Sequence, residues 1–214
     1  MASLNSKTAV LDNILWIMDR VFKKTNFGLV SWAHGDFFIR AGKDHRDHSL
    51  MELSYHLKNF YIPRDRKWIV LFPEGGFLKN RKLSSQRYAL KNNLPHLENV
   101  SLPRVGALKV ILDEVGGSSC KGGFPFHAIT LIIATSHGVK YLVDVTVAYP
   151  GGKPLDLQTI VGGWRRPCET IFHYRVYDID ELPAKEEELT TWLYERYYEK
   201  EKILQSYYDS GTFP

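Results

Sequence analysis

The sequence predicts an α/β fold in which a mixed, mostly parallel central sheet is flanked by helices. First, apolar runs of strand length alternate with segments of helical periodicity along the chain. Second, residues 68–72 are apolar at every position, as expected for a strand covered on both faces. Third, no repeat or linker divides the 214 residues, which are enough for one domain with a full core.

The first sixty residues predict two helices and two short strands. Apolar residues recur at helical spacing over residues 10–22, which indicates a helix with one apolar face. Residues 28–31 and 37–40 are short apolar runs of the kind found in strands. Helical spacing returns over residues 47–61, and Pro63 is expected to end this helix because it lacks an amide hydrogen.

The middle of the chain predicts one buried strand and two helices. The apolar strand at residues 68–72 runs directly into Pro-Glu-Gly-Gly at 73–76, which is a turn sequence. A basic, polar stretch at 79–93 is expected to be helical in part. Residues 105–115 predict another helix, which ends at a pair of glycines.

The last hundred residues predict a loop, three strands and a long helix. The glycine- and serine-rich segment 118–124 favours a loop. Strand-like runs follow at residues 128–135, 141–149 and 170–176. Residues 184–208 show a charged, aromatic and amphipathic pattern that predicts a helix, with three glutamates in its first turn, where negative charge suits the helix dipole.

The composition restricts the classes of partner and of site. A net charge of +4 favours anionic partners such as phospholipid headgroups or the phosphates of CoA. Nucleic acid is not expected as a partner, because the chain has no lysine and arginine stripe and no aromatic RNA-binding motif. The two cysteines fit a reducing compartment and show no metal-site spacing. No run reaches the roughly 20 apolar residues that a membrane span needs.

The turn after the buried strand is the first candidate for a site. A strand that ends in Pro73 and Glu74 places an acidic side chain at the carboxyl edge of the sheet, where open α/β sheets bind ligands. Gly75 and Gly76 would let a ligand approach the backbone closely. The alternative is an ordinary structural turn with no ligand.

The second candidate is the segment 35–40, which reads Gly-Asp-Phe-Phe-Ile-Arg. It would place the guanidinium of Arg40 at the end of a short strand. The planar fork of donors on arginine matches phosphate oxygens. The alternative is a surface arginine that follows a core strand.

Together these two segments resemble motifs of the 1-acylglycerol-3-phosphate acyltransferase family. Residues 35–40 are similar to the family's second motif, Gly-x-x-Phe-Ile-x-Arg, with Arg40 one place early. Residues 72–75 match its third motif, Phe-Pro-Glu-Gly. The resemblance extends from about residue 16 to residue 214, and it is closest to the lysophosphatidylglycerol acyltransferase branch over three runs, 34–40, 64–77 and 190–200.

The resemblance implies an acyl-CoA-dependent acyltransferase that moves a fatty acyl group to a lysophospholipid of the lysophosphatidylglycerol type. Arg40 would hold the acceptor's phosphate, and a fourth motif, an apolar strand ending in proline, would fall at 143–150. Acyl-CoA is expected as co-substrate, with no cofactor and no metal. The implied acceptor-binding residues are Gly35, Arg40, Pro73, Glu74 and Gly75.

The sequence departs from the family at the catalytic base. In the family, a His-x-x-x-x-Asp motif upstream of the second motif takes the proton from the attacking hydroxyl, and this chain has no such spacing upstream of residues 35–40. We therefore expect residues 1–214 to form a single acyltransferase-like domain that lacks its N-terminal part, with residues 1–13 unlike the family. The candidate for a substitute base is His34, which lies next to Gly35 and Asp36.

Two functions follow from this reading. One is an enzyme of phospholipid remodelling that acts at the cytoplasmic face of the endoplasmic reticulum membrane, as the resemblance implies. The other is a non-catalytic lipid-binding module that keeps the acceptor and lipid-contact surfaces without the base. Sequence upstream of Met1 discriminates between them, because an in-frame His-x-x-x-x-Asp motif there would favour the enzyme.

Overall fold

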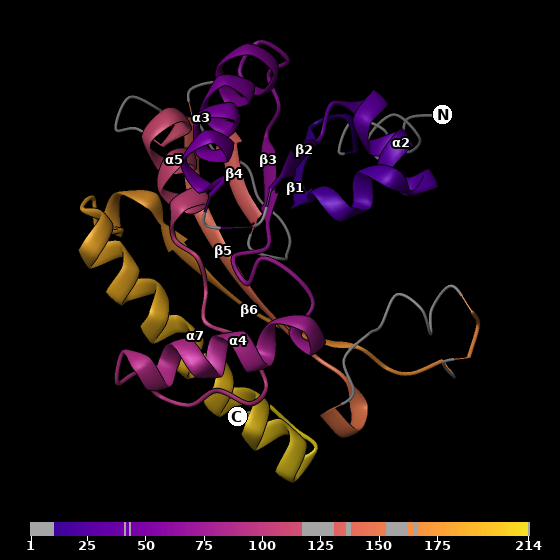
Figure 1. The fold of residues 1–214 in the computed structure, drawn as a ribbon, viewed down its shortest axis with the longest axis vertical. Helices are drawn as coiled ribbons and strands as arrows, with labels where there is room; N and C mark the ends of the chain where they lie inside the picture. Colours follow the sequence, from indigo (N-terminus) through magenta and orange to yellow (C-terminus); the bar gives the residue numbers. More distant parts are fainter. Residues whose placement is uncertain are drawn as a thin grey trace.

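The structure is a computed structural model that describes residues 11–40, 42, 44–116, 131–135, 138–152, 162–164 and 167–213. The strands are β1 (Ile14–Asp19), β2 (Phe37–Ile39), β3 (Trp68–Leu71), β4 (Leu131–Thr135), β5 (Gly138–Ala148) and β6 (Ile171–Asp178). The α-helices are α2 (Asn26–His34), α3 (Arg46–His56), α4 (Leu78–Lys91), α5 (Gly106–Val115) and α7 (Glu186–Ser210). Short helical turns are η1 (Arg20–Lys24), η2 (Leu57–Tyr61), η3 (Pro150–Gly152) and η4 (Ile179–Glu181). Figure 1 shows their arrangement.

The described strands form one sheet in the order β2-β1-β3-β4-β5-β6. β1 pairs in parallel with both β2 and β3, so that Ile17 lies opposite Phe37 on one side and Leu71 on the other. β4, β5 and β6 complete the sheet with antiparallel pairings. The predicted α/β fold with a mixed sheet flanked by helices is confirmed.

Parallel pairing covers the β2-β1-β3 half of the described sheet rather than most of it. The reason lies in the connections. Helices cross over between β1, β2 and β3, as parallel strands require. β4 ends at Thr135 and β5 begins at Gly138, so their connection is far too short for a crossover and enforces an antiparallel hairpin.

Two predictions in the first forty residues are wrong. Residues 10–22 were expected to form a helix, but they contain strand β1 and turn η1. β1 is a central strand with apolar residues on both faces, and such a run matches helical and strand spacing equally well. Residues 28–31 were expected to form a strand, but they lie inside α2. The Thr25 hydroxyl caps this helix by accepting the Gly28 amide at 3.0 Å.

The other predicted elements agree with the structure where it describes them. The strands expected at 37–40 and 68–72 are β2 and β3, and those at 141–149 and 170–176 are β5 and β6. The described part of the strand expected at 128–135 is β4. The helices expected at 47–61, 79–93, 105–115 and 184–208 correspond to α3 with η2, α4, α5 and α7. The predicted loop 118–124 lies outside the described residues.

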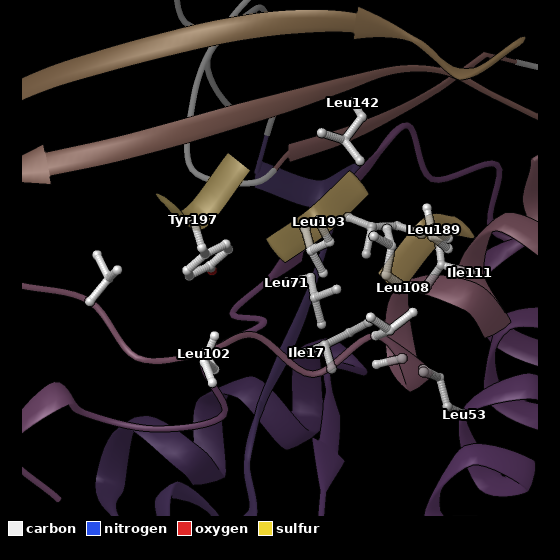
Figure 2. Packing of buried hydrophobic residues seen from close by; sticks show 14 of the residues in the cluster. Ile17, Leu53, Leu71, Leu102, Leu108, Ile111, Leu142, Leu189, Leu193 and Tyr197 are labelled. Carbon is white, nitrogen blue, oxygen red and sulfur yellow. The ribbon is translucent and has the colours of Figure 1, made fainter. Parts of the chain in front are cut away.

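The main core lies between one face of the sheet and helices α3, α5 and α7. Figure 2 shows Leu193 of α7 facing Leu71 of β3 and Ile17 of β1. Tyr197, one turn further along α7, is 2% exposed and belongs to the same cluster. The opposite face carries a smaller apolar cluster whose buried members are Val70, Val143 and Val145. Alternate residues of the central strands therefore enter different clusters, as the strand period of two requires.

Candidate functional site

The parallel strands end together at the carboxyl edge of the sheet. The register places Asp19, the last residue of β1, opposite Ile39, the last residue of β2. Arg40 follows directly. β3 ends at Leu71, and its continuation is the turn formed by residues 72–76. Arg40 and this turn, which the sequence placed in two separate motifs, therefore leave the sheet at the same edge.

The turn at residues 72–76 is a tight backbone reversal. The Gly75 amide donates to the Phe72 carbonyl at 2.9 Å. Gly75 has a φ of 69° and Gly76 a φ of 149°, values that L-residues with side chains rarely adopt. A Cβ on Gly75 would also lie 3.3 Å from the side chain of Arg104. The backbone conformation thus favours glycine, and a side chain here would also have to displace that of Arg104 by a few tenths of an ångström.

The Glu74 carboxylate points into the protein. It accepts hydrogen bonds from the backbone amide of Ser101 at 3.1 Å and from the Ser101 hydroxyl at 2.9 Å. The residue keeps some exposed surface, but its carboxyl group is enclosed, and this burial raises the pKa of Glu74. The two hydrogen bonds and the more distant Lys200 charge oppose the shift. Glu74 therefore fixes the turn to the loop that contains Ser101.

The loop around Ser101 is itself held by helix α7. The carboxylate of Glu201 accepts the backbone amides of Glu98, Asn99 and Val100 at distances between 2.9 and 3.2 Å. These contacts join segments about a hundred residues apart in the sequence. The shape of the turn at Glu74 consequently depends on the position of α7.

Two arginines converge on the turn. Arg81 Nε donates to the Glu74 carbonyl at 3.1 Å, and the Arg104 amide donates to the Pro73 carbonyl at 2.8 Å. Burial lowers the pKa of Arg104, and the neighbouring positive charge of Arg81 lowers it further. In the part of the chain that the structure describes, neither guanidinium has a carboxylate within 4.0 Å. The turn thus carries two guanidinium groups without a direct carboxylate partner, although Asp19 is close enough to raise the pKa of Arg104 against the effect of burial.

His34 and Gly35 lie at the opposite, amino end of β2. Their backbone carbonyls accept hydrogen bonds from Arg66, and His34 Nδ1 is 3.0 Å from Asp36 Oδ1. Asp36 Oδ1 also accepts the Trp16 amide at 3.1 Å. The buried carboxylate of Asp36 thus ties together β1 and the start of β2.

This placement divides the predicted site residues into two groups. Arg40, Pro73, Glu74 and Gly75 share the carboxyl edge, whereas Gly35 and His34 do not. Three residues of extended chain lie between Asp36 and Arg40, and the four steps from one to the other span about 13 Å at the usual rise of a strand. Gly35 ends α2 in the left-handed conformation, with a φ of 87°.

Sequence reasoning missed Ser101 and Arg104 as parts of the site. Both lie in a loop between α4 and α5 with no motif of its own, and only the fold brings this loop to the turn. Arg81 belongs to the basic stretch at residues 79–93 that follows the turn. Its position on the first turns of α4, seven residues after Glu74, was the one available signal for a contact there.

A buried ion network lies between β5 and α7, near this site. Lys200 Nζ is 2.6 Å from Asp144 Oδ1 and donates to the Val145 carbonyl at 2.7 Å. Arg175 Nη2 is 3.4 Å from the other oxygen of Asp144. Tyr197 is fully enclosed nearby, and its pKa is raised by burial and by the negative charges of Glu74 and Asp144.

The described residues contain no group of three or more histidine, cysteine, aspartate or glutamate side chains that could hold a metal ion. None of their helices combines the length and the apolar character needed to cross a membrane.

The relatives compared with this chain here are named as acyltransferases. Residues 159–214 match the family model described as the acyltransferase C-terminus. The chain is 48% identical over 214 residues to human acyl-CoA:lysophosphatidylglycerol acyltransferase 1 and 46% identical over 214 residues to the mouse protein, with 100% of this chain aligned in each case. It is 31% identical over 175 residues to zebrafish lysocardiolipin acyltransferase 1, covering 81% of this chain and 39% of that protein. No solved structure gives a significant match. The chain spans 58% of the length of the human and mouse relatives.

Proposed function

We propose that this chain, a member of the 1-acylglycerol-3-phosphate acyltransferase family, forms the acceptor-binding part of an acyl-CoA-dependent lysophospholipid acyltransferase. The observation that carries the proposal is the turn at residues 73–76, where Arg81 and Arg104 meet at the carboxyl edge. Relatives named as lysophosphatidylglycerol acyltransferases over the full length of this chain support the acceptor class. Their names also favour an enzyme over a non-catalytic module.

In the proposed reaction, a free hydroxyl oxygen of the lysophospholipid attacks the thioester carbonyl of acyl-CoA. A carbon–oxygen ester bond forms, the carbon–sulfur bond breaks, and CoA leaves as the thiol. The hydroxyl proton passes to a general base. In the family this base is the histidine of the His-x-x-x-x-Asp motif, which this chain lacks upstream of residues 35–40. The same spacing occurs from His173 to Asp178 in β6, but two strand residues five positions apart lie on opposite faces of the sheet and cannot form such a pair. The acyl group passes directly, so no acyl-enzyme intermediate is expected.

The arginines would bind the phosphate of the acceptor. Arg40 enters from the end of β2, as the family resemblance implies, and Arg104 lies beside Gly75. A guanidinium without a carboxylate partner gives charge-assisted hydrogen bonds to phosphate oxygens. Glu74 would act indirectly, because its carboxylate is occupied by Ser101 and holds the turn in shape. We place the reaction at the cytoplasmic face of the endoplasmic reticulum membrane.

Replacing Arg104 with alanine is expected to weaken lysophosphatidylglycerol binding by about tenfold, the loss of one charge-assisted contact to phosphate. Equilibrium binding to the purified chain measures this loss even without turnover. Arg87→Ala is the matched control, because Arg87 is exposed on the same helix as Arg81. Binding of CoA measured in parallel distinguishes the two sources of phosphate. Equal affinities for lysophosphatidylglycerol in the Arg104 and Arg87 variants would contradict the assignment.

A further inference from the structure

Helix α2 has its large apolar residues on the outside. Its two buried residues are the small Gly28 and Ser31. Its large apolar residues are instead more than half exposed: Phe27 at 55%, Leu29 at 65%, Val30 at 68% and Trp32 at 61%. A helix on the surface of a soluble domain normally shows the reverse arrangement, with a polar outer face.

The packing of α2 explains how this inverted arrangement is held. A Cβ on Gly28 would lie 1.9 Å from the carbonyl oxygen of Phe22, so only glycine allows the helix to sit against η1. The Thr25 cap fixes its first turn, and Gly35 ends it. The outward direction of the apolar residues is therefore imposed by the fold. In Figure 1, α2 lies beyond the β2 edge of the sheet, away from α4, α5 and α7.

A basic rim adjoins the apolar face. Arg20, Lys23 and Lys24 belong to η1, and all three are exposed. Within the described ranges, none of them has a carboxylate within 4.0 Å. Asp19, the nearest acid in sequence, uses its carboxylate to accept the Val21 amide at 2.9 Å. We call this surface the α2 face, and it consists of Arg20, Val21, Lys23, Lys24, Phe27, Leu29, Val30 and Trp32.

The α2 face is continuous with the candidate site. The rings of Phe22 in η1 and Phe77, which follows the turn at residues 73–76, lie 5.9 Å apart. Phe77 and Phe72 are themselves exposed at 41% and 44%. An apolar surface thus extends from α2 to the turn.

We propose that the α2 face docks onto an anionic lipid bilayer, with α2 lying in the interface. Exposed aromatic and aliphatic side chains can be buried at the headgroup boundary of a bilayer, and the lysine and arginine side chains of η1 beside them would attract anionic lipid. Anionic headgroups would supply the negative charge that Arg20, Lys23 and Lys24 lack nearby. An apolar protein partner would not supply it. This docking does not depend on the proposed reaction. It would place the turn at residues 73–76 next to the layer that holds a lysophospholipid.

The test is co-sedimentation of the chain with phosphatidylcholine vesicles that contain or lack phosphatidylserine. Burial of one large apolar side chain is worth about tenfold in partitioning. We therefore expect Trp32→Ser to weaken binding to the anionic vesicles by about tenfold. Lys23→Gln with Lys24→Gln should reduce the gain that phosphatidylserine confers and the sensitivity of binding to salt.

Trp164→Ser is the matched control, because Trp164 is 79% exposed but lies away from the α2 face in the sequence. It should leave vesicle binding unchanged. Equal losses of vesicle binding in the Trp32 and Trp164 variants would overturn the proposal. Failure of the wild-type chain to sediment with anionic vesicles would also overturn it. Conversion of a dimer to a monomer by Trp32→Ser, without a change in vesicle binding, would assign the face to a second copy instead. All these readouts are independent of catalysis, so they stand even if no acyl transfer is found.

Discussion

Replacing Lys200 with methionine is expected to destabilise the fold by about 3–5 kcal/mol. Lys200 is 4% exposed, and its ammonium group is the closest partner of the buried carboxylate of Asp144. Methionine fills much of the same volume but leaves Asp144 facing only Arg175, at 3.4 Å. It also removes the hydrogen bond that Lys200 donates to the Val145 carbonyl. Urea unfolding at neutral pH measures the loss as a lower midpoint.

Two variants separate the ion pair from other effects. Lys202→Met makes the same substitution two residues further along α7, at an exposed position, and should change stability by less than about 0.5 kcal/mol. Adding Asp144→Asn to Lys200→Met removes the uncompensated charge and should restore a large part of the stability. If Lys200→Met unfolds at the same urea concentration as the wild type, the buried pair does not exist in solution.

Replacing Glu74 with alanine is expected to cost about 1–3 kcal/mol, because the amide and the hydroxyl of Ser101 lose their acceptor in a buried place. Displacement of the turn should also lower acyl transfer by about a hundredfold in a form of the protein that has the catalytic base. Labelled acyl-CoA and a panel of lysophospholipids measure the second effect. Transfer at the wild-type rate by a stable Glu74→Ala variant would remove the turn from the site.

Glutamine at position 74 separates geometry from charge. Its side-chain carbonyl can still accept from Ser101, so the turn should keep its shape and most of its activity. Burial raises the pKa of Glu74 above its ordinary value of 4.5, so the folded state binds this proton more tightly than the unfolded state. Stability should then fall as the pH rises above 4.5 through the folded-state pKa. Glu74→Gln should lack this contribution, and an identical pH profile in both proteins would contradict it.

The fold was predictable wherever the length and the ends of an apolar pattern were clear. Residues 68–72 form a short apolar run that a turn sequence closes at once, and residues 184–208 keep helical spacing over a long stretch; both predictions are confirmed. β1 failed because apolar residues before and after it extend the pattern over residues 10–22, which is the length of a helix. α2 failed for the opposite reason, since its exposed apolar residues imitate a short buried strand.

Only the residues of the candidate site that lie in sequence motifs could be predicted. Glu74 and Arg40 follow strands, and the parallel register brings both to one edge, as the alternation of strands and helices indicated. Ser101 and Arg104 reach the turn through a loop whose position depends on contacts with Glu201, about a hundred residues later. No local pattern encodes such a contact. Gly35 and Arg40 are close in the sequence, but they lie at opposite ends of β2, so they do not share one edge of the sheet.

The hydrogen bonds from the loop at residues 98–100 to Glu201 can form only late in synthesis of the chain. α7 is translated after all the other described elements, and its contacts with that loop are among the most distant in the sequence. The parallel strands can pair on the ribosome while the face that α7 covers is still open to water. Packing of the described elements should therefore be completed only when α7 emerges and the turn at Glu74 acquires its shape. Until then, chaperones that recognise apolar surface would have a binding site on the growing chain.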